Sequence, residues 1–161
     1  KETGGNIHDN GTIEITTKSN TSNSKYLVDY EKDNFFNSGS PKDEEIRFDF
    51  KERRIQLSSY LIQSHKNGKG DGKTINNYPG HLRNWVIEVS NDGKTWKIID
   101  RHENDSTLNG SSIIANFDIK SKTNDFYRFV KLRTTGLSWY GDDRHDIFFP
   151  FIEFYGKMKE Q

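Results

Sequence analysis

Side chains able to recognise a ligand recur in the polar stretches of this chain. Aromatic faces stack on the C–H face of sugars and also anchor protein interfaces. Arginine and histidine donate hydrogen bonds to hydroxyl and carboxylate groups. Residues of these two kinds predict a binding surface for a glycan or a protein. The candidates are Tyr30, His65, Tyr78, His81, Arg83, Trp139, Tyr140, Arg144 and His145.

Two aromatic pairs in these stretches have opposite expected exposure. Trp139 and Tyr140 precede Gly141-Asp142-Asp143, a polar turn sequence, so we expect both rings to be exposed to a ligand. Phe35 and Phe36 are candidates for the same surface, but we expect them to close the end of the hydrophobic core.

Two copies of Gly-Lys-Thr, at residues 72–74 and 93–95, resemble the end of a phosphate-binding P-loop. A P-loop needs another glycine five residues before its Gly-Lys pair, and Asn67 and Glu88 stand at those positions. Neither copy opens a predicted helix whose N-terminus could hold phosphate. Nucleotide binding is therefore not predicted.

The acidic residues do not predict catalysis. Glu44 and Glu45 are adjacent, as are Asp142 and Asp143, whereas glycoside hydrolysis needs two carboxyl groups that face each other across a cleft. The chain has 0 cysteines, which excludes thiolate nucleophiles and thiolate metal sites. The 5 histidines show no zinc-binding spacing. We predict no enzymatic activity and no cofactor; a structural calcium ion is an alternative without a supporting motif.

Composition limits the classes of partner. The chain has 161 residues, enough for one domain with a sizeable core, and its formal net charge is +0. No broad positive field would attract DNA or RNA, and no apolar run is long enough to span a bilayer. Hydrophobic content is 30%, but the 13% aromatic content argues against disorder and predicts a core rich in Phe, Trp, Tyr and Ile. Residues 1–11 are expected to be a loose lead-in, and the start at Lys1 suggests a piece of a longer protein.

The clearest structural element is a β-hairpin at residues 82–99. Trp85, Ile87 and Val89 alternate on one face of the first strand. Asp92-Gly93 then supplies a turn that accepts positive φ, and Trp96 and Ile98 are expected to resume the apolar face. The hairpin predicts an antiparallel β architecture.

Other segments repeat this pattern with polar connections between them. Predicted strands cover residues 12–16, 26–30, 46–50, 54–64 (with a bulge where the alternation slips), 113–119, 126–134 and 147–155. No segment sustains a helical period. We therefore predict an all-β fold, an antiparallel β-sandwich of the jelly-roll type with about eight core strands.

The lengths of the connections predict where a site would lie. Successive antiparallel strands run in opposite directions, so successive connections alternate between the two ends of the sandwich. The connections at 51–53, 90–94 and 120–125 are short, whereas those at 65–81, 100–112 and 135–146 are long. By the same count, segment 30–44 lies at the end of the sandwich that carries the long connections. Binding residues concentrate on loops held by a rigid scaffold, so we expect the site at the long-loop end.

Several segments together resemble the discoidin, or coagulation factor 5/8 type C, family. Their order and spacing fit that family over roughly residues 45–156, and the hairpin is the most specific of them. The segments are IRFDF (46–50), RRIQLSSYLI (53–62), LRNWVIEVSNDGKTWKII (82–99), RFVKLRTTG (128–136) and IEFYG (152–156).

The resemblance implies a galactose-binding-like jelly roll, and the chain length predicts that residues 1–161 form one such domain. The cysteine-free chain and its Gly4-Gly5-Asn6 lead look similar to intracellular members found beside BTB domains. We therefore expect a non-catalytic, cytoplasmic protein-interaction module, with fusion to a BTB domain in the full-length protein. The alternative is a carbohydrate-binding, galactose-type lectin-like module that is secreted or at the cell surface.

Overall fold

The body of the protein is a sandwich of two antiparallel sheets. The computed structural model describes residues 6–19, 23–31, 33–39, 41–72, 80–121 and 124–160. One sheet has five strands, in the spatial order β1 (Glu14–Thr17), β3 (Glu45–Asp49), β8 (Phe129–Thr134), β5 (Trp85–Ser90) and β6 (Lys97–His102). The other sheet has three strands, in the order β10 (Phe151–Glu160), β4 (Arg53–Gln63) and β7 (Ile114–Asp118).

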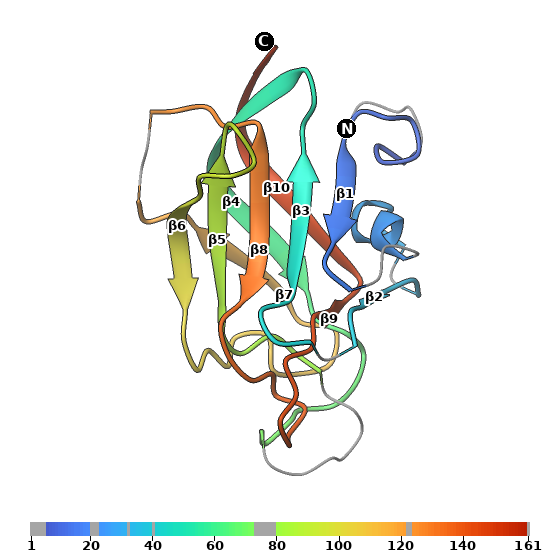
Figure 1. The fold of residues 1–161 in the computed structure, drawn as a ribbon. Helices are drawn as coiled ribbons and strands as arrows, with labels where there is room; N and C mark the ends of the chain where they lie inside the picture. The colour runs from blue at the N-terminus through green and yellow to red at the C-terminus, as the bar shows by residue number, and fades with distance from the viewer. Residues whose placement is uncertain are drawn as a thin grey trace.

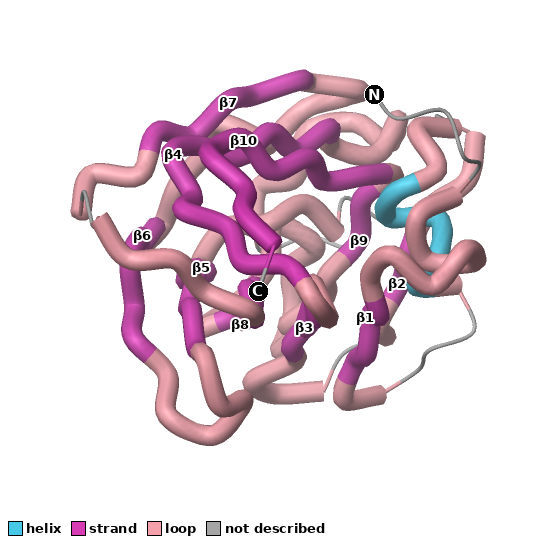
Figure 2. The backbone as a smooth tube through the Cα atoms, turned by 90° about the horizontal axis from the view of Figure 1, so that it is seen from above, coloured by secondary structure: helices cyan, strands magenta, loops and turns pink. Residues whose placement is uncertain are grey.

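The view along the strands in Figure 2 shows these two sheets as separate layers. A short ribbon of β2 (Phe36–Asn37) and β9 (Phe148–Phe149) lies beside them, at the lower right of Figure 1. The predicted all-β, antiparallel sandwich is confirmed, and the eight strands of the two main sheets match the expected number.

Large aromatic side chains fill the space between the sheets, as the composition predicted. Trp85, Tyr60 and Phe48 are 0% exposed, and Phe36 closes the core near β9 with 0% exposure. The expectation that Phe36 is a core residue is therefore confirmed. Phe35, in contrast, keeps 36% of its surface exposed.

One segment predicted as a strand is a 3-10 helix. Residues 26–30 were expected to be extended, but η1 covers Ser24–Val28. Its buried side chains are Ser24, Leu27 and Val28, a spacing of one helical turn that brings all three onto one side. The strand prediction was wrong because five residues are too few to separate this spacing from alternation.

A β-bulge reverses which side chains of the second hairpin strand face the core. Ile87 pairs with Asp100 and Glu88 pairs with Ile98, which leaves Ile99 as the extra residue. Ile99 is consequently buried at 3% exposure, whereas Ile98 is 39% exposed. The prediction that Trp96 and Ile98 face the core was therefore wrong: the extra residue turns the alternation over, and Trp96 is only partly buried.

The bulge predicted within residues 54–64 is confirmed. Tyr155 pairs with Ser59 and Gly156 pairs with Leu57, so Ser58 is the extra residue on β4. The last predicted strand is also interrupted, since β9 and β10 are separated at Pro150, which has no N–H to donate to a sheet.

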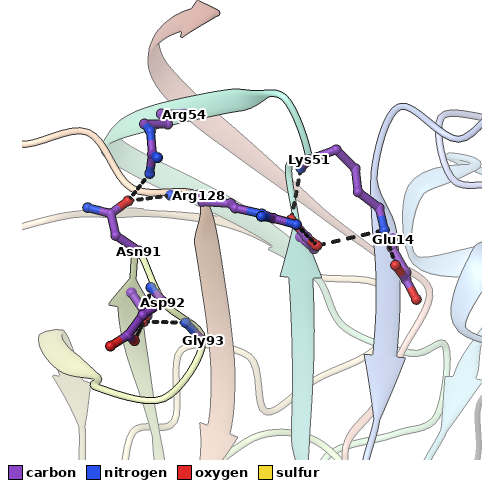
Figure 3. A network of polar contacts seen from close by, with 9 residues as sticks. Glu14, Lys51, Arg54, Asn91, Asp92, Gly93 and Arg128 are labelled. Atoms are coloured by element: carbon purple, nitrogen blue, oxygen red, sulfur yellow. Dashed lines mark hydrogen bonds and ion pairs between the residues drawn. The ribbon is translucent and has the colours of Figure 1, made fainter. Parts of the chain in front are cut away.

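Short connections and the chain ends occupy the upper end in Figure 1, where polar contacts tie strands from different parts of the sequence. Arg128 donates two hydrogen bonds to Asp49, at 2.7 and 2.8 Å. Lys51 forms ion pairs with Asp49 and with Glu14 on β1. Figure 3 shows Lys51 between Glu14 and Arg128. In the hairpin turn, Gly93 has φ +69°, as the Asp-Gly sequence predicted. These contacts tie β1, β3 and the β7–β8 connection together at this end of the sandwich.

Candidate ligand-binding site

All the long connections emerge at one end of the sandwich. Figure 1 shows the β4–β5, β6–β7 and β8–β9 connections together at the bottom, beside the chain that leads from β2 to β3. The prediction from alternating connections is therefore confirmed. The structure describes residues 64–72 and 80–84 of the first of these loops; Tyr78 lies outside the described residues.

Trp139 is the point at which three of these loops meet. Its indole Nε1–H donates to the Asp105 carbonyl at 2.9 Å, and its backbone N–H donates to the His81 carbonyl at 2.9 Å. The Arg83 guanidinium lies over its ring, 4.4 Å from the centroid. Arg83 is held in turn by Asn104, whose Oδ1 accepts from Nε at 2.8 Å. The indole is therefore fixed in orientation while remaining partly exposed.

The next residues of the same loop line a pocket of about 320 Å³. Arg144 lies over the Tyr140 ring at 4.6 Å and forms an ion pair with Asp146, at 2.7 Å between Nη2 and Oδ1. The Asp146 side chain is only 3% exposed and raises the pKa of Arg144, mainly through this hydrogen bond. The lining residues are Asn37, Gly80, Tyr140, Arg144, Asp146 and Phe148.

The pocket combines groups suited to a hydroxyl-rich ligand. The Tyr140 ring offers an apolar face, the Arg144 guanidinium offers N–H donors, and the Asn37 amide offers an acceptor. Buried Asp146 accepts from Arg144 and from Ser138, so it holds the guanidinium in a fixed position before a ligand arrives. No water-activating base or nucleophile pair is required for such recognition.

Two predicted residues, His65 and His81, lie beneath this surface. His65 is 6% exposed and stacks on Phe148, with 4.1 Å between ring centroids. His81 is 1% exposed, and its Nδ1 lies 3.4 Å from Asn109 Oδ1. Burial lowers the pKa of both imidazoles, which favours the neutral form. The structure therefore corrects the expectation that these rings face a ligand: they pack under the loops.

Other predicted residues lie at the margin of the cluster or against a strand. His145 is partly buried, with Nε2 3.6 Å from Asp143 Oδ1. Tyr30 packs against β10, 5.5 Å from the Phe151 ring, and burial followed by the Glu153 charge raises its pKa to about 12. The structure brings Arg83 next to Trp139 and Tyr140 next to Arg144, but it places Tyr30 against β10.

Four lining residues of the pocket were not among the predicted site residues: Asn37, Gly80, Asp146 and Phe148. Asp146 could have been found, because an acid two residues after Arg144 in a loop can pair with it. Asn37 and Phe148 carry no such signal, since they meet through the β2–β9 pairing of distant segments.

In residues that the structure describes, no group of three or more His, Cys, Asp and Glu side chains is arranged to hold a metal ion. Within the same described ranges, no helix has the length and apolarity needed to cross a membrane.

Comparison with solved structures identifies the fold. A family 32 carbohydrate-binding module from Clostridium perfringens NanJ, in complex with galactose, has a TM-score of 0.62 and 9% identity over 92% of this chain and 95% of that one. A CBM32 module from a family 31 glycoside hydrolase of the same organism has a TM-score of 0.66 and 14% identity over 92% and 94%. A chitosan-binding module from a Paenibacillus chitosanase/glucanase has a TM-score of 0.61 and 12% identity over 90% and 96%. The chain thus has the galactose-binding-like β-sandwich fold.

Sequence comparison adds a relative of a different kind. The E3 ubiquitin-protein ligase Ufd4 of Drosophila melanogaster is 28% identical over 109 residues, which are 65% of this chain and 4% of the ligase. No family model matches the chain. These comparisons do not support the expected association with a BTB domain.

Proposed function

We propose that this chain is a non-catalytic carbohydrate-binding module that binds a glycan at the long-loop end. The observation that carries the proposal is the pocket lined by the residues that follow Trp139 in the same loop, in which Tyr140 supplies an aromatic face and Arg144, held by buried Asp146, supplies fixed donors. Sugars present hydroxyl groups on a ring with an apolar face, and this arrangement complements both. The carbohydrate-binding modules of the same fold support the proposal.

The proposal reverses the order of preference that the sequence suggested. Protein interaction was the main expectation and carbohydrate binding the alternative. The structural neighbours favour the alternative, since one of them is in complex with galactose and another is a chitosan-binding module.

A glycan array followed by calorimetry with the best glycan tests the proposal. We expect binding at millimolar affinity or tighter, and a loss of at least about tenfold in the double variant Trp139→Ala, Tyr140→Ala. Tyr155→Ala is the matched control, because Tyr155 is a 39% exposed aromatic residue on β10. Unchanged affinity in the double variant would reject this location for the site.

A second function, protein interaction, is favoured by the similarity to the E3 ligase. It is the function that goes with our expectation of a cytoplasmic location. If a folded sample of the domain bound no glycan on the array, protein interaction would be favoured over carbohydrate binding. The same double variant would then be tested against candidate protein ligands, because aromatic residues also anchor protein interfaces.

A further inference from the structure

His102, at the end of β6, lies between two carboxylates. Its Nε2 is 2.8 Å from Asp100 Oδ2 and its Nδ1 is 2.7 Å from Asp105 Oδ2. The side chain of His102 is 16% exposed, and those of Asp100 and Asp105 are 5% and 20% exposed. A neutral imidazole donates from one nitrogen only, so both hydrogen bonds require the protonated ring.

Side chains from three other strands surround the His102 ring and its Asp100 partner. Trp85 from β5 stacks on the ring at 4.2 Å, and Phe117 from β7 meets its edge at 4.9 Å. From β4, the Tyr60 hydroxyl donates to the same Asp100 oxygen at 2.8 Å. The neighbouring charges of Arg101 and Glu103 pair with each other, at 3.6 Å. The two aspartates are thus the charges that face the imidazole.

Titration of this group follows from these contacts. Burial by itself would lower the pKa of His102, but the hydrogen bonds and charges of Asp100 and Asp105 outweigh burial and raise it. Burial opposes ionisation of both carboxyl groups. At Asp100 the hydrogen bonds from His102 and Tyr60 outweigh burial and lower the pKa. At Asp105 hydrogen bonds from Thr107, followed by the contact with His102, lower the pKa. The imidazolium therefore persists to higher pH than in an unperturbed histidine and is lost as the pH rises through the raised pKa.

Asp105 connects this triad to the candidate site. Its side chain accepts from His102, while its backbone carbonyl accepts the Trp139 indole N–H and its backbone N–H donates to the Arg83 carbonyl, both at 2.9 Å. A displacement of Asp105 would therefore move both members of the Arg83–Trp139 pair.

We propose that His102 is a positioning residue for the candidate site: its imidazolium fixes Asp105, which seats Trp139, and ligand binding weakens when the ring loses its proton. The inference rests on the proposed function of the site. After deprotonation, one ring nitrogen has no hydrogen and directs its lone pair toward a carboxylate, so one of the two hydrogen bonds is lost. Asp100 is the more buried partner, at 5% against 20% exposure, so the contact given up is the one with Asp105. Asp105 then keeps the Thr107 N–H, which donates to its other oxygen at 2.8 Å.

Two-dimensional NMR of the ligand-free protein tests the linkage without any glycan. The Trp139 indole N–H signal is assigned with Trp139→Phe and followed, together with the His102 ring nitrogens, from about pH 5 to about pH 9. We expect the indole signal to shift with the midpoint of the His102 titration. In Asp105→Asn the midpoint of His102 is expected to fall, and in His102→Gln the indole shift is expected to disappear.

The NMR titration has a control variant and two outcomes that would contradict the proposal. His8→Gln is the control: His8 accepts a hydrogen bond from the backbone N–H of Ile15 on β1. This variant should leave the pH-dependent shift of the Trp139 indole signal unchanged. An indole signal that stays flat while His102 titrates in the unmodified protein would overturn the proposal, as would the same shift persisting in His102→Gln. The first outcome needs no variant of His102, so it decides the matter even if His102→Gln does not fold.

Binding supplies the second arm of the experiment. With the best glycan from the array, we expect affinity to fall at least about fivefold across the His102 titration, and to become independent of pH in this range in His102→Gln. Binding with a flat pH profile would reject the role of His102 while keeping the proposed function. Absence of any glycan binding would reject the proposed function, and the NMR titration would still test the linkage.

Discussion

The ammonium group of Lys131 lies 4.0 Å from the centroid of the Trp96 ring. Lys131 is itself only 6% exposed and pairs with Glu88 at 3.1 Å on the outer face of the five-stranded sheet. Arg47 lies over the same ring at 5.0 Å. Trp96 therefore covers a charged layer on the outside of the sheet and does not fill the core.

Trp96→Ala is accordingly expected to destabilise the protein by about 1–2 kcal/mol, from lost cation–π contact and partial exposure of the charged layer. Trp85→Ala is the comparison, because Trp85 is 0% exposed and its loss is expected to cost about 3–5 kcal/mol. Chemical denaturation of the two variants measures both free energies of unfolding. Equal losses would contradict the placement of Trp96 on the outer face.

Gly156 should be intolerant of a side chain. A β-carbon at this position would lie 2.0 Å from the Gln56 carbonyl oxygen, because the β4 bulge brings the two backbones together. Gly156→Ala is expected to cost about 3 kcal/mol or more, since backbone must move. At Gly11 a β-carbon meets nothing within 4 Å, so Gly11→Ala carries only the penalty of its φ of +78°, about 1–2 kcal/mol. Thermal or chemical denaturation that ranked the two variants in the opposite order would refute the bulge geometry.

Arg83→Lys should weaken ligand binding with little effect on stability. Lysine retains the charge but loses the planar group that stacks on Trp139 and the Nε–H that donates to Asn104. We expect a several-fold loss of glycan affinity and a change in unfolding free energy below about 1 kcal/mol. Arg101→Lys provides the control, because Arg101 pairs with exposed Glu103 on β6. Calorimetry that found both variants equal in affinity would exclude Arg83 from the site.

Stability should pass through a maximum near pH 6.5. Buried His65 and His81 have lowered pKa values, so their protonation in the unfolded chain favours unfolding below about pH 6.5. His102 has a raised pKa, so its contribution is present below about pH 6.5 and is lost as the pH rises through the raised pKa. Asp49 and Glu88 have lowered pKa values because bonds from Arg128 and Arg133 outweigh burial, and their contribution is lost in acid.

Denaturation with urea at a series of pH values measures this profile. In His102→Gln the decline on the alkaline side is expected to disappear, while the acid side keeps its shape because the carboxylates and the other two histidines are unchanged. A free energy of unfolding that continues to rise between about pH 6.5 and about pH 9 in the unmodified protein would contradict the assignment for His102.

Local sequence was sufficient to predict which side chains face the core in strands whose alternation is not interrupted by a bulge. Trp85, Ile87 and Val89 alternate and are buried as predicted, because a strand in a sandwich has one face toward the core. Alternation failed at Trp96, where one inserted residue, Ile99, reverses the faces. A bulge depends on what the partner strand requires, and a single strand does not carry that information.

The sequence by itself determined the antiparallel sandwich and the end at which its long loops emerge. Side-chain alternation and loop length are local properties of the sequence. Because successive antiparallel strands run in opposite directions, the order of long and short loops then tells at which end each loop lies. Tertiary structure alone decided which loop residues contact one another and how deeply they lie. His65 and His81 are covered by other segments, whereas Arg83 and Asp105 reach Trp139 across distances of 56 and 34 positions along the chain. Depth and pairing of this kind follow from the packing of separate loops, which no local pattern encodes.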